Sequence, residues 1–250
     1  MKRLFIPWLI IVIVLGSASY LYAQRASGSS ASASGSSSAI PITAGATPLE
    51  LARAAFLAQG GEKFRAVKNM VLIGSVDLYG PTSTQSIPGK FVIVMAGERL
   101  RMEVSAPPVI NFKQLYDGHN TYSSIPGAEL PPPNKLGLPV LANFDQPGYT
   151  VTAIPDKKKQ RGFRISDAEG FSTDFYVDSA TGQVVSYLFK FGGYNFGVEH
   201  KRVKRLEGVL VPYRFSQRIE LPQGAAFADF SVKEAKINQQ LSDDVFTVPD

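Results

Sequence analysis

After Met70, most of the chain consists of short runs in which apolar and polar side chains alternate. In "RLRMEV", Leu100, Met102 and Val104 fall on one side, and the other side carries Arg99, Arg101 and Glu103. In "VLVPYRFSQRIEL", one side carries Val209, Val211, Tyr213, Phe215, Ile219 and Leu221. Because successive side chains of a strand point to opposite faces, this period of two predicts antiparallel strands with one buried face.

Turn signals such as Asp117-Gly118, Thr181-Gly182 and Gly192-Gly193 separate these runs, and we expect about ten or eleven strands. Pro212 lies inside one run, which favours an edge position or a bulge. The proline-rich residues 126–148 interrupt the strands, so we expect a long loop with a short helix near Leu138–Phe144. The fold class is therefore α+β and mainly β.

A single helix is expected before the first strand, in "TPLELARAAFLAQGG". Thr47 fits the N-cap, Pro48 the first helical position, and Glu50 completes a capping box. Phe56 lies on the apolar face of this helix, and the Gly60-Gly61 pair ends it.

The first 46 residues predict an export signal followed by a tether. Lys2 and Arg3 precede an apolar run, so residues 1–23 read as a signal peptide that is cleaved, or as a signal anchor in which residues 4–23 stay in the membrane. Both readings leave Lys2 and Arg3 in the cytosol and deliver the rest to the periplasm or another extracytoplasmic space. Residues 24–46, rich in Ser, Ala and Gly, read as a flexible linker. Residues 47–250 then form one folded domain.

Composition argues against several kinds of chemistry. The chain has no cysteine and only two histidines, so we expect neither a metal site nor a cofactor. The cluster "DGHN" holds Asp117 and His119, but Asp117-Gly118 is a tight-turn signal between two apolar runs. A surface hairpin is therefore favoured over a hydrolase site, and we expect a protein that is not an enzyme.

Basic residues gather in "EHKRVKRLEG", which contains His200, Lys201, Arg202, Lys204 and Arg205. They fall on both sides of a strand, which favours a solvated strand end. A surface that meets anionic lipid head groups or an envelope protein is the alternative. Nucleic acid is not expected as a partner, because no aromatic residues are interleaved with the basic ones.

Aromatic residues concentrate in "YLFKFGGYNFG". Tyr187, Phe189 and Phe191 share one face of a strand, and Tyr194 and Phe196 share one face of the next. Two such strands make a broad apolar wall, which is either an ordinary core under the N-terminal helix or the lining of a pocket for an acyl chain.

The order of several segments resembles the LolA/LolB-like superfamily, the outer-membrane lipoprotein-sorting and lipoprotein carrier proteins. The matching segments cover about residues 47–250: the N-terminal helix, "VLIGSVDLYG", "GKFVIVMAGERLRMEV", "LYDGHNTYSSIPG", "VDSATGQVVSYLF", "VKRLEGVLVPYRF" and "LSDDVFTVP". The resemblance implies a strongly curved antiparallel sheet, an unclosed barrel, whose hollow side is covered by the N-terminal helix and by a short helix and loop.

The chain departs from that family at two points. Ala96-Gly97 stands where lipoprotein-shuttling members tend to have a basic residue and a proline, which argues against lipoprotein release specifically. The absence of cysteine argues against the acylated, receptor-type members.

The resemblance implies an exported, non-enzymatic carrier that takes part in outer-membrane biogenesis and holds lipid or lipoprotein acyl chains in an apolar hollow. The alternative is a membrane-tethered sensor or protein-interaction domain of the same fold, of the envelope-stress regulator type. The expected contacts with the acyl chain are Phe56, Leu100, Met102, Val104, Tyr187, Phe189, Phe191, Tyr213 and Phe215.

Overall fold

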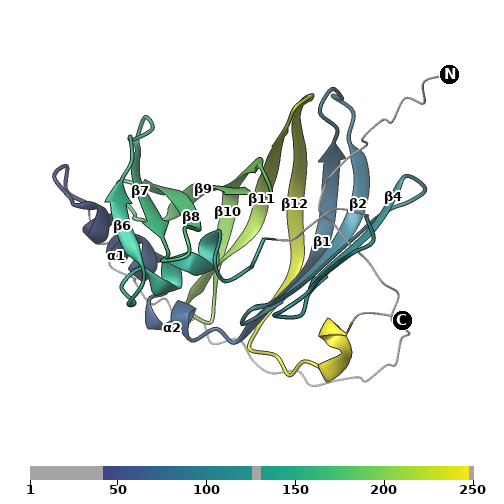
Figure 1. Ribbon diagram of the computed structural model, residues 1–250, viewed down its shortest axis with the longest axis horizontal. Helices are drawn as coiled ribbons and strands as arrows, with labels where there is room; N and C mark the ends of the chain where they lie inside the picture. Colours follow the sequence, from purple (N-terminus) through teal and green to yellow (C-terminus); the bar gives the residue numbers. More distant parts are fainter. Residues whose placement is uncertain (1–41, 126–130, 248–250) are drawn as a thin grey trace.

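A computed structural model of the protein describes residues 42–125 and 131–247 (Figure 1). In this part of the chain, twelve strands form one antiparallel sheet in the order β5-β4-β3-β2-β1-β12-β11-β10-β9-β8-β7-β6. Their bounds are β1 Asn69–Tyr79, β2 Ile87–Ala96, β3 Arg99–Ala106, β4 Ile110–Tyr116, β5 Thr121–Ser123, β6 Thr150–Ala153, β7 Gln160–Ser166, β8 Ser172–Asp178, β9 Val184–Phe191, β10 Tyr194–Leu206, β11 Val209–Leu221 and β12 Gly224–Ile237.

The sheet is strongly curved and does not close, as the resemblance implied (Figure 1). Strands that follow one another in the chain are neighbours, and only the pairing of β1 with β12 joins distant segments. The two ends of the strand order, β5 and β6, are only three and four residues long. Strands this short carry too few residues to show alternation, which accounts for the lower number expected from the sequence.

The N-terminal helix is present with its predicted cap. Helix α1 spans Pro48–Gln59, and the Glu50 amide donates to the Thr47 hydroxyl at 3.3 Å while the Glu50 carboxylate accepts from the Thr47 amide at 2.7 Å. Gly60, with φ of 136°, ends it. The short α2, Glu62–Arg65, follows.

Two short 3₁₀ helices complete the fold, η1 at Leu138–Asn143 and η2 at Asp243–Phe246. The first confirms the short helix expected in the proline-rich loop, of which residues 126–130 lie outside the described residues. Among the described residues, none of the helices has the length and apolar character needed to cross a membrane.

The start of the described chain contacts the fold. The side chains of Ile42 and Ala46 pack beside α1, and the Arg161 guanidinium donates to the carbonyl of Thr43 at 2.9 Å. The last five residues of the predicted linker therefore lie against the domain. The rest of that linker and the predicted export signal, residues 1–41, lie outside the described residues.

The two faces of the sheet differ in composition. We call the face that carries Tyr187, Phe196, Phe215 and Phe230 the inner face, because cross-strand pairing aligns these residues and their neighbours in the apolar core. The opposite face, which we call the outer face, carries Glu199, Ser216, Arg218 and Asp229 over the same strands.

Two apolar clusters occupy the inner face. The helix cluster joins α1 and η1 to β7 and β8 and contains Phe56, Leu141, Phe144, Phe163 and Phe175. The sheet cluster joins β1–β4 to β11 and β12, and its largest members are Phe91, Phe112 and Phe230.

A third cluster lies on the outer face of β2–β4, which the sequence pattern did not predict. The segment around η2 covers this face and packs Phe246 against Val94 and Leu115. It also buries Glu103, which is 3% exposed and forms an ion pair with Arg101, while Arg101 donates to the carbonyl of Val245 at 2.7 Å. The expectation that β3 has one buried face was therefore wrong, because a segment about 140 residues away in the chain covers the charged side.

Two further sequence predictions can be checked here. Asp117 and His119 lie in the β4–β5 hairpin turn, where the Asp117 carboxylate accepts from the amides of His119 and Asn120 at 2.7 Å each. Pro212 lies beside an irregularity in the pairing of β10 with β11, as its position within a strand predicted.

Candidate functional site

The inner face forms a nearly continuous aromatic wall. Along β7–β10 the ring centroids of Phe163 and Phe175 are 5.2 Å apart, those of Phe175 and Tyr187 are 6.1 Å apart, and those of Tyr187 and Phe189 are 6.4 Å apart. Phe189 then stacks on Phe196 at 5.1 Å. Three of these ring pairs are direct cross-strand pairs, and the fourth, Tyr187 with Phe189, joins two residues on the same face of β9. The alternation seen in the sequence is therefore sufficient to build the wall.

A second aromatic group lies further along the same face. Phe215 stacks on Phe230 at 4.6 Å, and the Phe230 ring meets Phe91 edge-on at 5.0 Å. Phe91 and Phe230 are buried, whereas Phe215 and the neighbouring Tyr213 are half-buried. The wall thus continues from the helix cluster into the sheet cluster.

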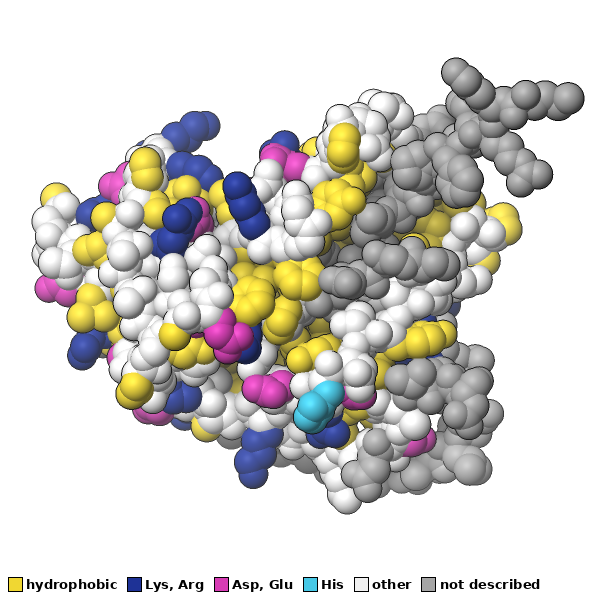
Figure 2. All heavy atoms as spheres, viewed as in Figure 1, with side chains coloured by type: hydrophobic (Ala, Val, Ile, Leu, Met, Phe, Trp, Pro, Cys, Tyr) yellow, Lys and Arg dark blue, Asp and Glu magenta, His cyan; other side chains and the backbone are white. Residues whose placement is uncertain are grey.

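The helices cover one end of this wall. The main contacts of α1 are with β6, β7, η1 and the start of β11, where the Gln59 amide donates to the carbonyl of Leu210. Figure 2 shows hydrophobic side chains gathered in a hollow near the middle of the molecule, over β10 and β11. Half-buried apolar residues that pack against the sheet cluster include Met102, Leu206, Tyr213 and Phe215.

The nine residues expected to contact an acyl chain fall into three groups. Leu100, Met102, Val104, Tyr213 and Phe215 belong to or pack against the sheet cluster. Phe56 and Tyr187 belong to the helix cluster, where the Phe56 ring lies 5.4 Å from Phe144 and the Tyr187 ring borders Gly137 just before η1. The Phe189 ring stacks on those of Tyr187 and Phe196, and Phe191 lies half-buried beside the β9–β10 turn. The structure therefore brings five of them together and gives Phe56 a packing role at the other end.

Two polar side chains on this wall were missed or misplaced by sequence reasoning. His200 was expected in a solvated basic run, but its ring meets Tyr187 edge-on at 5.8 Å, and its Nδ1 lies 3.1 Å from the carbonyl of Val184. Burial lowers the pKa of His200 despite that hydrogen bond, and burial raises the pKa of the Tyr187 hydroxyl. In the sequence, His200 continues the alternation of Tyr194, Phe196 and Val198, and this could have placed it on the inner face. The strand pairing, which sets it opposite Phe215, agrees.

Gln114 is the second such residue. It is 0% exposed and lies on the inner face of β4 between Phe112 and Tyr116. The alternation of "INFKQLY" would have indicated its inward position. This leaves one amide among apolar neighbours.

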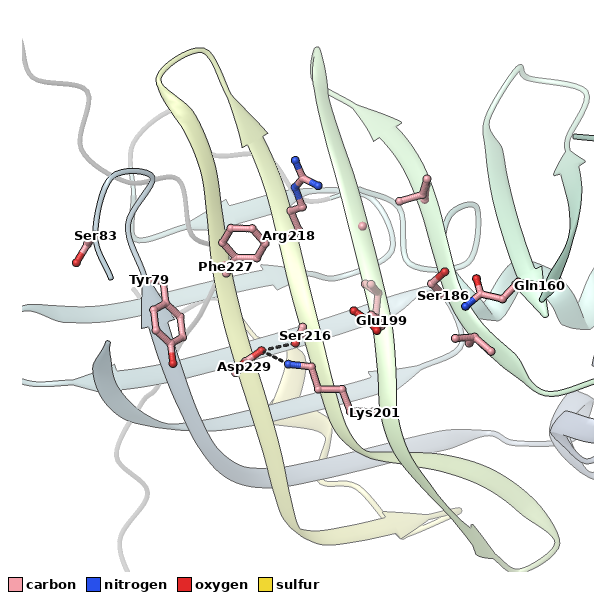
Figure 3. Close-up of a pocket in the computed structure, with 14 residues that line it drawn as sticks. Tyr79, Ser83, Gln160, Ser186, Glu199, Lys201, Ser216, Arg218, Phe227 and Asp229 are labelled. Atoms are coloured by element: carbon pink, nitrogen blue, oxygen red, sulfur yellow. Dashed lines mark hydrogen bonds and ion pairs between the residues drawn. The ribbon is translucent and has the colours of Figure 1, made fainter. Parts of the chain in front are cut away.

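The outer face carries a shallow groove of about 620 Å³ that runs across β9–β12 toward β1 (Figure 3). Asp229 accepts hydrogen bonds from the Lys201 ammonium at 3.0 Å and from the Ser216 hydroxyl. Burial alone would raise the pKa of Asp229, but these two hydrogen bonds and the positive charges of Lys201 and Arg214 together outweigh it, and the pKa is lowered. Phe227 and Leu188, which are 40% and 37% exposed, supply the apolar surface of the groove.

The charges near the groove are largely paired with one another. Arg218 pairs with Glu220 at 2.9 Å, and Arg164 pairs with Asp174 beside an adjoining depression of about 580 Å³. In the described part of the chain, no group of three or more His, Asp and Glu side chains is placed to hold a metal ion.

Comparisons with known proteins support the fold alone. Neither a protein-family model nor a curated protein matches the chain. Solved structures do match it. A LolA superfamily protein from Nitrosomonas europaea has a TM-score of 0.52 and 11% identity, with 81% of this chain and 98% of that chain covered.

Two further solved structures match over a similar length. A DUF1329 family protein from Desulfovibrio piger has a TM-score of 0.51 and 10% identity over 80% of this chain and 95% of that one. A putative outer membrane lipoprotein-sorting protein domain from Vibrio parahaemolyticus has a TM-score of 0.50 and 10% identity, with the same shares covered. The resemblance stated from the sequence is thereby confirmed at the level of the fold: the chain shares its fold with a LolA superfamily protein and with a lipoprotein-sorting domain.

Proposed function

We propose that this protein is an extracytoplasmic carrier that holds the acyl chains of a lipid or lipoprotein against the inner face of its sheet. The observation that carries the proposal is the extent of the apolar wall: Met102, Tyr213 and Phe215 lie half-buried on it, and none of them is on β6 or β7, the strands with which α1 makes most of its contacts. The fold shared with a putative lipoprotein-sorting domain supports the same function.

The energetics favour a cargo with a long hydrocarbon chain. Burying an acyl chain is worth about 0.8 kcal/mol per CH₂ group, so a chain that leaves a bilayer needs an apolar surface of similar extent to receive it. The wall of stacked rings offers such a surface without any bond being made or broken. This agrees with the expectation of a non-enzymatic protein.

The direct test is a search for bound lipid. The protein is expressed with its own leader, and the exported form is purified without detergent and measured by native mass spectrometry. Lipids are extracted from the same preparation and identified. The proposal predicts added masses that correspond to acylated molecules. An apo mass alone, together with no binding of a fluorescent fatty acid, would contradict it.

A matched pair of variants locates the site. Phe215→Ser removes a ring from the inner face, and Phe227→Ser removes one from the outer face of the neighbouring strand. We expect the first to weaken binding of the fluorescent fatty acid about tenfold, since a lost aromatic contact of 1–2 kcal/mol changes affinity by that order. The second leaves binding unchanged, and urea unfolding verifies that both variants are folded. Equal losses in the two variants would count against an inner-face site.

The location outside the inner membrane is part of the proposal. It is supported by the apolar run after Lys2 and Arg3, and the sequence of the exported protein's N-terminus tests it. A start near residue 24 indicates a free carrier, and an intact leader indicates an anchored domain. Recovery of the protein in the cytosol would refute the location.

The outer groove favours a second candidate, a protein-interaction domain of the same fold. Phe227 and Leu188 expose apolar surface there, on the face opposite the aromatic wall. A partner cross-linked in the cell envelope and lost in Leu188→Asp, with fatty-acid binding unchanged, would support this candidate.

A further inference from the structure

Among the buried polar side chains of the described residues, Gln114 differs from the others because it has no hydrogen-bond partner. Four such residues are less than 5% exposed: Gln59, Glu103, Gln114 and Thr173. Gln59 donates to the carbonyl of Leu210, Glu103 pairs with Arg101, and the Thr173 hydroxyl accepts from the amide of Gly137 at 3.0 Å. Neither Nε2 nor Oε1 of Gln114 has a hydrogen-bond partner in this part of the chain.

The Gln114 amide belongs to the inner face. Gln114 is paired across the strands with Met102 on β3 and Ser123 on β5, and its neighbours two residues away, Phe112 and Tyr116, are in or against the sheet cluster. The intervening Leu115 points to the outer face, into the cluster around Phe246. Gln114 therefore lies on the wall that the proposed function assigns to the acyl chain.

An unpaired amide in such a place destabilises the fold. Leaving a buried donor or acceptor without a partner costs about 1–3 kcal/mol, whereas leucine or methionine would occupy a similar volume without that cost. Buried polar groups in folded proteins are almost always paired, so an amide with no partner in the described chain is open to one from outside it, an ordered water or a bound ligand.

The chemistry of the amide defines the partner. Its Nε2 donates and its Oε1 accepts, so both are satisfied by a group that presents a carbonyl oxygen close to an N–H or O–H. A hydrocarbon satisfies neither, and a simple ester satisfies only the donor. We propose that Gln114 binds the linkage of the cargo, an acyl carbonyl next to a hydrogen-bond donor, as found in N-acyl amides and in monoacylglycerols. This inference rests on the proposed function and adds the polar part of the ligand to it.

Three oleoyl probes test the inference by displacing a fluorescent fatty acid from the full-length protein. Monooleoylglycerol and N-methyloleamide carry a carbonyl and a donor, and methyl oleate carries the carbonyl alone. The wild type should bind at least one of the first two more tightly than methyl oleate, and the preferred one identifies the linkage as ester or amide. Gln114→Leu should abolish that preference, weakening the preferred probe about tenfold, as expected for a pair of hydrogen bonds.

The control is Gln217→Leu, which changes a half-buried glutamine on the inner face of β11 and should leave the preference intact. Apo stability gives an independent readout: Gln114→Leu, or Gln114→Met should the first variant not fold, should unfold at a higher temperature than the wild type. A lower unfolding temperature for both variants, or an unchanged preference, would overturn the role of Gln114. A wild type that binds none of the probes would refute the carrier function itself.

Discussion

His200 allows a quantitative test of how the inner wall is built. Its imidazole is held between Tyr187 and the carbonyl of Val184, and burial lowers its pKa below the ordinary value of about 6.5. Between that folded-state pKa and 6.5, the unfolded chain binds a proton that the folded protein does not. The free energy of unfolding therefore falls as the pH is lowered through this window.

The size of the effect has an upper limit set by one proton. If the folded protein keeps His200 neutral at pH 5.5, protonation of this histidine stabilises the unfolded state by about 1.4 kcal/mol at that pH. At pH 7.5 the same stabilisation is close to zero. Carboxylates whose pKa is lowered in the folded protein, such as Asp117 and Asp229, also contribute to its stability. That contribution is lost only below about pH 4, outside this range.

The assay is urea unfolding of the wild type and two variants at pH 7.5 and pH 5.5. His200→Asn keeps an amide donor where Nδ1 stands but cannot titrate, so its stability should be nearly the same at both values. His119→Ala, at the exposed hairpin turn, should retain the full pH dependence of the wild type. If the dependence instead disappears with His119, or survives unchanged in His200→Asn, the placement of His200 in the wall is wrong.

Three further predictions concern stability measured by urea unfolding. Gly74→Ala should destabilise by roughly 1–3 kcal/mol, because an added Cβ would collide with the carbonyl of Ser231 and lie 2.8 Å from the Phe91 ring; an effect below 0.5 kcal/mol would show that the β1–β12 pairing can relax. Phe246→Ala should cost about 3 kcal/mol by opening the cluster on the outer face of β2–β4, and a near-neutral result would mean that the C-terminal segment does not dock in solution. Thr47→Ala should cost about 1 kcal/mol through loss of the α1 cap, with an unchanged stability counting against the capping box.

Much of the fold was predictable because it depends on local signals. Strand alternation determines which side chains share a face, and the cap of α1 lies within four consecutive residues. The grouping of Met102 with Phe215 on one wall could be expected from the same alternation together with the family resemblance.

What was missed depends on contacts between distant parts of the chain. The burial of Glu103 follows from a segment that returns to cover β3, and no pattern within "RLRMEV" signals that return. His200 was read with its basic neighbours, although the strand pairing places it on the inner face, where its ring packs against Tyr187. That Gln114 has no hydrogen-bond partner among the described residues likewise follows only from the positions of the side chains around it in the folded protein.

The brevity of β5 and β6 matters because, within the described residues, they are the two edge strands of the sheet. A long, flat edge strand can pair with a strand from another chain, which leads to fibres or oligomers. Edge strands of three and four residues give an incoming strand very few backbone groups with which to form hydrogen bonds. A sheet of this shape can thus stay unclosed at little risk of self-association, and we expect that lengthening either edge strand would promote aggregation.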